Sequence, residues 1–136
     1  MILIVDSGST KSDWIAIDSK SGSYLFERQR TRGLNPAIIS KKEAFDIIAE
    51  NEILMKNKSK VEYVFFYGAG CSSQKMNDEI KRGIQSVFKG AEVFVDHDLL
   101  ACAYATYDGE PGISCIIGTC LLYTSDAADE GLGVDL

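Results

Sequence analysis

Residues 6–11 are the first stretch of the chain whose residue types suit chemistry; they read Asp-Ser-Gly-Ser-Thr-Lys and follow the apolar residues 2–5. In a tight turn of this composition, consecutive backbone N–H groups can bind a phosphate, and hydroxyls and a lysine add donors. An aspartate at the end of the preceding strand can hold Mg²⁺ directly or through water. The pattern is not a Walker A loop, because Gly-x-x-x-x-Gly-Lys-[Ser/Thr] is absent. A plain polar hairpin turn also explains these residues, so both interpretations stay open here.

Two further segments place polar residues at the end of an expected strand. Asp96, His97 and Asp98 close a short strand and open a helix. An aspartate at that position is either a helix cap or, if it loses solvent, a general base for a hydroxyl. His97 would orient Asp98 or face solvent, and we expect it to face solvent. Gly118 and Thr119 follow an apolar run and by themselves indicate only a strand that enters a turn.

The elements that must position these segments are strands and helices in alternation. Apolar runs and alternation predict six strands, at residues 2–5, 13–17, 24–30, 61–67, 92–95 and 113–117. Residues 19–22 form a second polar turn, so the first three strands make a β-meander. The order β-β-β-α-β-α-β-α-β predicts an α/β layer.

Three helices connect the later strands. Ser40 and Glu43 form a capping box for the first, and Ser72 or Ser73 caps the second. The third, residues 98–107, is apolar and Ala-rich, so we expect it to be buried. The apolar faces of the first two predict core positions, namely Ala44, Ile47, Ile48 and Leu54 or Met55 in the first and Met76, Ile80, Ile84, Val87 and Phe88 in the second.

Length and composition narrow the class of protein. A chain of 136 residues with 46% hydrophobic residues forms one globular domain. The net charge of −6 disfavours nucleic-acid and anionic-membrane binding, and no apolar run is long enough to span a membrane. The N-terminus lacks the basic region of a signal peptide, so we expect a cytoplasmic protein. The four cysteines form no Cys-x-x-Cys pair and are expected to be small buried residues, at positions 71, 102, 115 and 120.

Residues 120–136 differ from the rest of the chain. They follow directly on a buried-strand pattern and resemble the translated read-through of a transposon-based sequencing adapter. We therefore expect the native sequence to stop at Thr119 and keep the tail out of the fold prediction.

The motifs of residues 1–119, taken together and in order, resemble the actin/hexokinase/heat-shock ATPase superfamily. Within it they are most similar to the BadF/BadG/BcrA/BcrD-type ATPase family, which includes the N-acetylglucosamine kinases. The family's first phosphate loop is an Asp-x-Gly-x-Thr hairpin, which residues 6–11 match. Residues 67–71, Tyr-Gly-Ala-Gly-Cys, and 98–101, Asp-Leu-Leu-Ala, match its later motifs. Residues 116–119 match the start of the second phosphate loop, which the family continues as Gly-Ser-Asn and this chain as Cys-Leu-Leu.

The resemblance implies a ribonuclease H-like, actin-like ATPase N-terminal lobe over residues 1–119, with a mixed sheet, an N-terminal β-meander and flanking helices. It implies phosphoryl transfer from ATP with Mg²⁺ to an amino sugar such as N-acetylglucosamine. Asp6 would organise Mg²⁺, Asp98 would be the catalytic base, and Asn35 would contact the sugar. The phosphates would be held by Gly8, Ser9, Thr10, Lys11, Gly118 and Thr119. A fragment without the second lobe is expected to be inactive.

Two other functions stay open. One is an ATPase activator of an acyl-CoA dehydratase or reductase, which needs cysteines for an iron–sulfur cluster between subunits; Asp98 and Asn35 favour the kinase. The other is a non-catalytic nucleotide- or sugar-binding protein on the same fold. The partners expected are a sugar and ATP, without nucleic acid or membrane, and a homodimer is left open.

Overall fold

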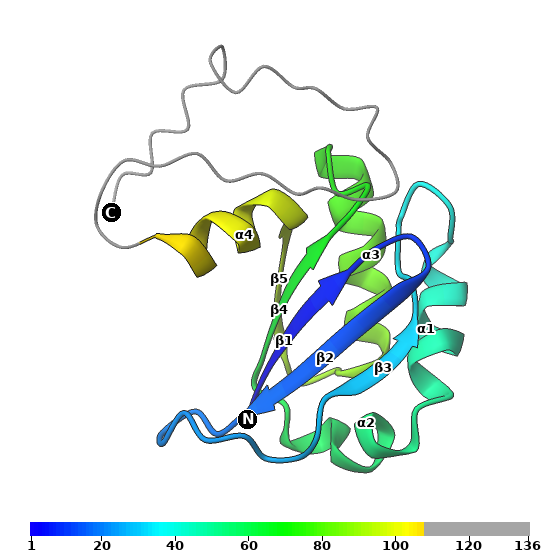
Figure 1. Ribbon diagram of the computed structural model, residues 1–136. Coiled ribbons are helices and arrows are strands. Elements are labelled where there is room, and N and C mark those ends of the chain that lie inside the picture. The colour runs from blue at the N-terminus through cyan, green and yellow to red at the C-terminus, as the bar shows by residue number, and fades with distance from the viewer. Residues whose placement is uncertain (108–136) are drawn as a thin grey trace.

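A five-stranded mixed sheet forms the frame of the computed structural model, which describes residues 1–107 (Figure 1). The strands lie in the order β3-β2-β1-β4-β5. Their bounds are β1 Ile2–Ser7, β2 Lys11–Ile17, β3 Gln29–Arg32, β4 Tyr63–Gly68 and β5 Glu92–His97. The antiparallel pairs β1–β2 and β2–β3 form the predicted β-meander, while β1–β4 and β4–β5 are parallel.

The register aligns polar residues in one row across the sheet. Asp6 of β1 pairs with Asp13 of β2 and with Tyr67 of β4. Arg30 pairs with Asp13 on one side, and Asp96 pairs with Tyr67 on the other. Because residues in register point to the same face of a sheet, these five side chains share one face near the carboxyl ends of β1, β4 and β5.

Within residues 1–107, four α-helices and one short 3₁₀ helix accompany the sheet. They are α1 Lys41–Ala49, α2 Glu52–Asn57, η1 Lys58–Lys60, α3 Gln74–Val87 and α4 Asp98–Thr106. The capping box of Ser40 with Glu43 starts α1 as predicted, and Ser73 caps α3. The sequence predicted a single helix over the first segment, but the structure has two. The Asn51 side chain accepts a hydrogen bond from the Leu54 N–H, and this second cap starts α2.

The hydrophobic core lies between one face of the sheet and helices α1, α2 and α3, which Figure 1 shows on a single side. Trp14, Phe66 and Phe88 are its largest fully buried side chains. The opposite face is more open. On it Phe65 stacks on Phe94 with 5.1 Å between ring centroids, and Phe94 is 43% exposed. The face with the polar row is therefore the less covered one.

Helix α4 lies over that open face, where Tyr104 meets the ring of Tyr67 edge-on. The expectation that α4 is buried was wrong for the residues described: none of its side chains is fully buried here. Apolar composition predicted its helical state but not what covers it. Residues 1–107 include no helix long and apolar enough to cross a membrane.

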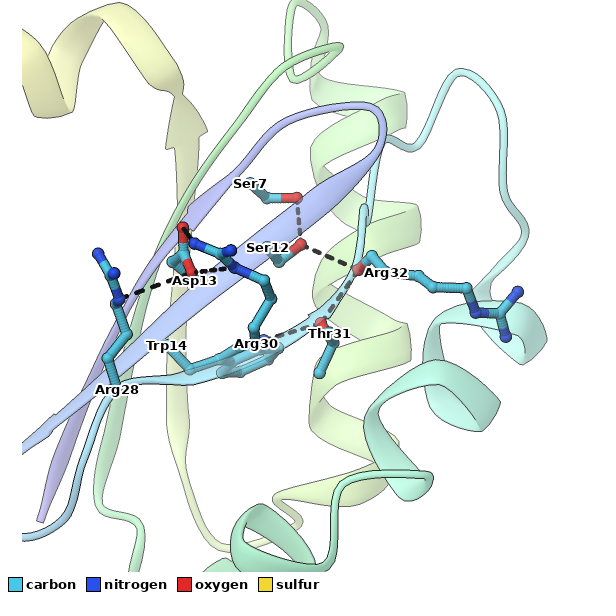
Figure 2. A network of polar contacts seen from close by, with 8 residues as sticks. All are labelled: Ser7, Ser12, Asp13, Trp14, Arg28, Arg30, Thr31 and Arg32. Atoms are coloured by element: carbon cyan, nitrogen blue, oxygen red, sulfur yellow. Dashed lines mark hydrogen bonds and ion pairs between the residues drawn. The ribbon is translucent and has the colours of Figure 1, made fainter.

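The third strand begins later than predicted. Residues 24–30 alternate in polarity, yet β3 is Gln29–Arg32 and only Tyr24 makes an isolated bridge, to Ile17. The Trp14 Nε1–H donates to the Thr31 hydroxyl at 3.0 Å, which helps to fix this register (Figure 2). The strand predicted at 113–117 lies outside the described residues.

Candidate functional site

The turn between β1 and β2 keeps polar donors available to solvent. Asp6 lies near the end of β1, and the Gly8 N–H donates to the Lys11 carbonyl at 2.9 Å to close the hairpin. Ser9, Thr10 and Lys11 are exposed. Within residues 1–107, no hydrogen bond uses the backbone N–H of Ser9 or Thr10, or the Thr10 hydroxyl. Two adjacent unpaired N–H groups beside a lysine are the donor set that a phosphate needs.

A buried hydroxyl pair fixes the base of this hairpin. Ser7 and Ser12, 1% and 0% exposed, face each other across β1 and β2 with 2.7 Å between their Oγ atoms (Figure 2). The Ser7 Oγ also accepts from the Leu34 N–H at 3.0 Å, and the Ser12 hydroxyl donates to the Arg32 carbonyl at 3.2 Å. The hairpin is thus bonded to the chain that leaves β3.

The loop after β3 packs directly against the hairpin backbone. A Cβ placed on Gly33 would lie 2.4 Å from the Ser9 carbonyl carbon and 2.5 Å from the Gly8 oxygen. No side chain fits there, because both neighbours are backbone atoms. Glycine at position 33 therefore allows the close approach of two loops.

Asn35 joins three loops at one point. Its Nδ2 donates to the Ser9 hydroxyl at 2.9 Å, and its Oδ1 accepts from the Ala37 N–H at 2.9 Å. Gly70, in the turn after β4, has φ +82°, and a Cβ there would lie 2.0 Å from the Asn35 Oδ1. Asn35 is only 8% exposed. The predicted sugar contact thus belongs to a side chain that already braces the hairpin.

The Asp6 carboxylate lies near the carboxylates of Asp13 and Asp98. Partial burial raises its pKa, and the negative charges of Asp13 and Asp98 raise it further, while Lys11 opposes them. These interactions place Asp98 of α4 and Lys11 of the hairpin near Asp6. A carboxylate destabilised by neighbouring negative charge favours a bound cation.

Asp13 is held in a different way. The Arg30 Nε and Nη2 donate to its two carboxylate oxygens at 2.8 and 3.2 Å, and the Arg28 Nε lies 3.8 Å away (Figure 2). The Arg30 hydrogen bonds lower the pKa of Asp13. Asp6 is therefore the carboxylate of the β1–β2 pair that keeps no arginine partner in the described structure. Among residues 1–107, no three His, Cys, Asp or Glu side chains form a metal-binding group, so any Mg²⁺ there would rely on Asp6, phosphate oxygens and water.

Asp98 is the first residue of α4 and is half-buried, with its Oδ1 accepting from the Leu99 N–H at 3.0 Å. The N-cap is His97, whose Nδ1 accepts from the Leu100 N–H at 3.1 Å. The His97 side chain is 38% exposed, as expected, and it also caps α4. Because His97 satisfies the helix end, Asp98 is not needed as the cap.

The cysteines of the described chain do not resemble cluster ligands. Cys71 is 3% exposed, and burial raises the pKa of its thiol to about 12. Its burial agrees with the expectation of a small core residue, whereas Cys102 is only half-buried. Cys115 and Cys120, like Gly118 and Thr119, lie outside the described residues.

Sequence reasoning missed several residues that build this site. They are the buried pair Ser7 and Ser12, the close-packed Gly33, the arginine-bound Asp13 and the helix cap His97. The alternation of β1 and β2 places positions 7 and 12 on the core face, beside Val5 and Trp14. A serine on a core face was thus an available signal for a buried hydroxyl bond.

Strand order, mixed pairing and flanking helices define the fold of an actin-like ATPase or sugar kinase lobe. A solved structure from Porphyromonas gingivalis, of a candidate N-acetylglucosamine kinase, matches with a TM-score of 0.66 and 34% identity. The match covers 77% of this chain and 37% of that one, so the chain spans little more than a third of its length. No family model matches the chain, and neither does any curated protein. The chain is kinase-like in fold and sequence.

Proposed function

We propose that the protein to which this chain belongs is a cytoplasmic kinase that transfers phosphate from ATP to an amino sugar such as N-acetylglucosamine. The observation that carries the proposal is the hairpin next to Asp6, whose Ser9 and Thr10 N–H groups are unpaired within residues 1–107. Asp98, at the start of α4, lies close enough to Asp6 to act on its charge. The 34% identity to a candidate N-acetylglucosamine kinase supports the sugar class.

In this proposal each part of the site has one task. The backbone N–H groups of Ser9 and Thr10, the Thr10 hydroxyl and the Lys11 ammonium bind the β- and γ-phosphates, with Gly8 at the base of the hairpin. Asp6 would hold Mg²⁺, which would supply positive charge to the phosphates. Gly118 and Thr119 begin the opposing clamp. The hairpin supplies position and charge, which is most of what phosphoryl transfer requires.

Asp98 is the proposed base. The γ-phosphoryl group passes from ATP to a sugar hydroxyl, whose proton goes to the Asp98 carboxylate, and ADP and a sugar phosphate leave. The Asp98 Oδ1 accepts from the Leu99 N–H, and this bond orients the carboxylate at the start of α4. Asn35 contacts the sugar from the loop after β3.

The rest of the active site is proposed to lie in a second lobe. Because this chain spans 37% of the solved neighbour, we propose that residues 1–119 form one lobe and are inactive alone. Residues 120–136 are proposed to be adapter-derived. Resequencing the source DNA across codon 119 tests this: a reading frame that continues as Gly-Ser-Asn supports the proposal, and confirmation of residues 120–136 contradicts it.

The kinase proposal is tested on the complete protein with MgATP and a panel of sugars and amino sugars, with sugar phosphate detected by mass spectrometry. Asp98→Asn should lower kcat by about 10²–10⁴-fold, the typical contribution of a general base. Asp96→Asn is the matched control, because Asp96 lies near the end of β5, two residues before Asp98. This variant should retain activity. Tight binding without turnover would indicate a sensor instead, and iron content with sugar-independent ATP hydrolysis would indicate a dehydratase or reductase activator.

A further inference from the structure

Helix α4 differs from the other described α-helices in the chemistry of its N-cap. The caps of α1, α2 and α3 are side-chain oxygens whose protonation does not change near neutral pH, from Ser40, Asn51 and Ser73. The cap of α4 is the Nδ1 atom of His97, which accepts from the Leu100 N–H at 3.1 Å. Histidine ordinarily changes its charge between pH 5 and 8, so among these four caps this one can be removed by a proton.

The cap requires a neutral imidazole. Because Nδ1 accepts the Leu100 N–H, the ring carries its proton on Nε2, which lies 3.6 Å from the Asp96 Oδ1. A second proton, taken from water, binds at Nδ1, and the imidazolium that results has two donors and no acceptor. Protonation of His97 therefore leaves the Leu100 N–H without its cap.

Asp98 is the acceptor that can replace this cap. It is the first residue of α4, and its Oδ1 accepts from the Leu99 N–H at 3.0 Å. Aspartate side chains also bond to backbone N–H groups two residues later, as Asp18 does with the Lys20 N–H at 3.1 Å. The Leu100 N–H stands in the same relation to Asp98. A carboxylate bonded to that N–H is less available to a sugar hydroxyl.

Several elements bring other titratable side chains near the start of α4. Within the described chain they include Asp96 of β5, Asp6 of β1, Tyr67 of β4, Cys71 after β4, Lys81 of α3 and Tyr104 of α4. Burial raises the pKa of Tyr67, and it raises that of the Cys71 thiol to about 12, so both groups stay neutral near pH 7. A substitution at position 97 keeps all of these groups, so it isolates the effect of the imidazole.

We propose that His97 is a positioning residue whose neutral imidazole caps α4 and so leaves the Asp98 carboxylate free to accept the sugar proton. When His97 is protonated, the Leu100 N–H passes to Asp98, and the carboxylate turns away from the sugar hydroxyl. The loss of activity in weak acid then reports the protonation of His97 rather than that of the base. The inference rests on the proposed kinase function.

The test compares kcat of the complete wild-type protein and of His97→Asn, with MgATP and N-acetylglucosamine, from pH 8 to 5.5. Asparagine supplies a cap oxygen that no proton removes, so His97→Asn should match the wild-type kcat within about threefold at pH 8. At pH 5.5 its kcat should exceed that of wild type by about fivefold or more, the factor that a typical N-cap represents. His97→Ala has no cap, so its kcat should lie about fivefold below wild type at pH 8, with an unchanged KM for MgATP, and approach wild type at pH 5.5.

Ser73→Ala is the matched control, because it removes the cap of α3 and should leave the pH dependence of kcat unchanged. The Leu100 amide resonance is a readout without catalysis: it should titrate together with the wild-type kcat and stay in place in His97→Asn. A Leu100 resonance that does not titrate in the wild type contradicts the proposal. If His97→Asn and wild type lose kcat in parallel while both phosphorylate the sugar, the positioning role is wrong and the kinase stands. If the wild type phosphorylates no amino sugar, both proposals fall.

Discussion

Two turns of similar composition differ in what they do with their hydrogen-bond donors. In the turn after β2, Asp18 Oδ1 accepts from the N–H groups of Lys20 and Ser21 at 3.1 and 2.8 Å and from the Ser21 hydroxyl. The Gly22 N–H also donates to the Asp18 carbonyl, so three consecutive N–H groups of that turn are bonded. The hairpin at residues 8–10 leaves two N–H groups unpaired in the described chain and is braced from behind by Gly33 and Asn35. A turn that bonds most of its own donors serves as a connection, whereas we propose that the braced turn with open donors is the phosphate-binding site.

The largest expected difference between the turns is in activity. Asp6→Asn removes the proposed Mg²⁺ carboxylate and should lower kcat/KM by about 10²-fold or more, the scale for loss of one electrostatic stabiliser. Asp18→Asn, in the other turn, should leave kcat/KM within about threefold, because its carboxylate contacts only its own turn. Steady-state phosphorylation by the complete protein measures both. Equal losses of kcat/KM in the two variants would contradict the proposed difference between the two turns.

Gly33, in the loop behind the hairpin, and Gly22, in the other turn, should respond differently to substitution by alanine. Gly33→Ala forces a Cβ into hairpin backbone and should lower the free energy of unfolding by about 1–3 kcal/mol while weakening MgADP binding. Gly22 has φ +68°, and nothing lies within 4 Å of a Cβ placed there, so Gly22→Ala should cost about 1 kcal/mol of strain and leave MgADP affinity unchanged. Urea unfolding and MgADP titration separate the two effects. Unaltered MgADP binding by Gly33→Ala would contradict the claim that the loop at Gly33 holds the hairpin in place.

The buried hydroxyls should contribute more to the free energy of unfolding than the exposed ones. Ser12→Ala breaks the bonds to Ser7 and to the Arg32 carbonyl and should lower the free energy of unfolding by about 1 kcal/mol. Ser23→Ala, in the exposed second turn, should change it by less than about 0.5 kcal/mol. Chemical denaturation is the readout. A Ser12→Ala protein as stable as wild type would show that the pair does not hold the hairpin base.

The smallest effect is a pH dependence of opposite sign at the two aspartates. The pKa of Asp6 is raised, so its ionisation opposes folding above the ordinary carboxyl value of 3.8. The pKa of Asp18 is lowered by the Ser21 and Lys20 hydrogen bonds, so its ionisation favours folding above that value. At pH 7 Asp6→Asn should therefore stabilise the protein and Asp18→Asn should destabilise it. Both differences in the free energy of unfolding should shrink on acidification, which unfolding curves from pH 7 to 3 measure. If both variants changed this free energy in the same direction, the opposite pKa shifts of Asp6 and Asp18 would be contradicted.

The sequence predicts the local structure of residues 1–107 well where one side chain decides it. Ser40 with Glu43 starts α1, and the β-meander follows from short polar turns between apolar strands. The sequence does not predict the start of β3, which depends on how residues 29–32 pair with the distant strand β2. A local signal was missed as well, because the Asn51 side chain caps the Leu54 N–H and divides a periodic segment into two helices.

The site shows the same division. The residue types at positions 6–11 and 98 predicted phosphate and base chemistry, and the structure brings Asp6, Lys11 and Asp98 near one another. Asp18 distinguishes the turn at residues 19–22 locally, because it accepts from N–H groups two and three residues later. The brace behind residues 8–10 comes from Gly33 and Asn35, which are contacts of the folded chain.

The central claim is tested most directly by the amide resonances of the two turns. Isotope-labelled complete protein titrated with MgADP should show saturable shifts at the Ser9 and Thr10 amides, while Lys20 and Ser21 stay in place. That result would establish the open hairpin as the phosphate site. Absence of saturable shifts at Ser9 and Thr10, or equal shifts in both turns, would contradict it.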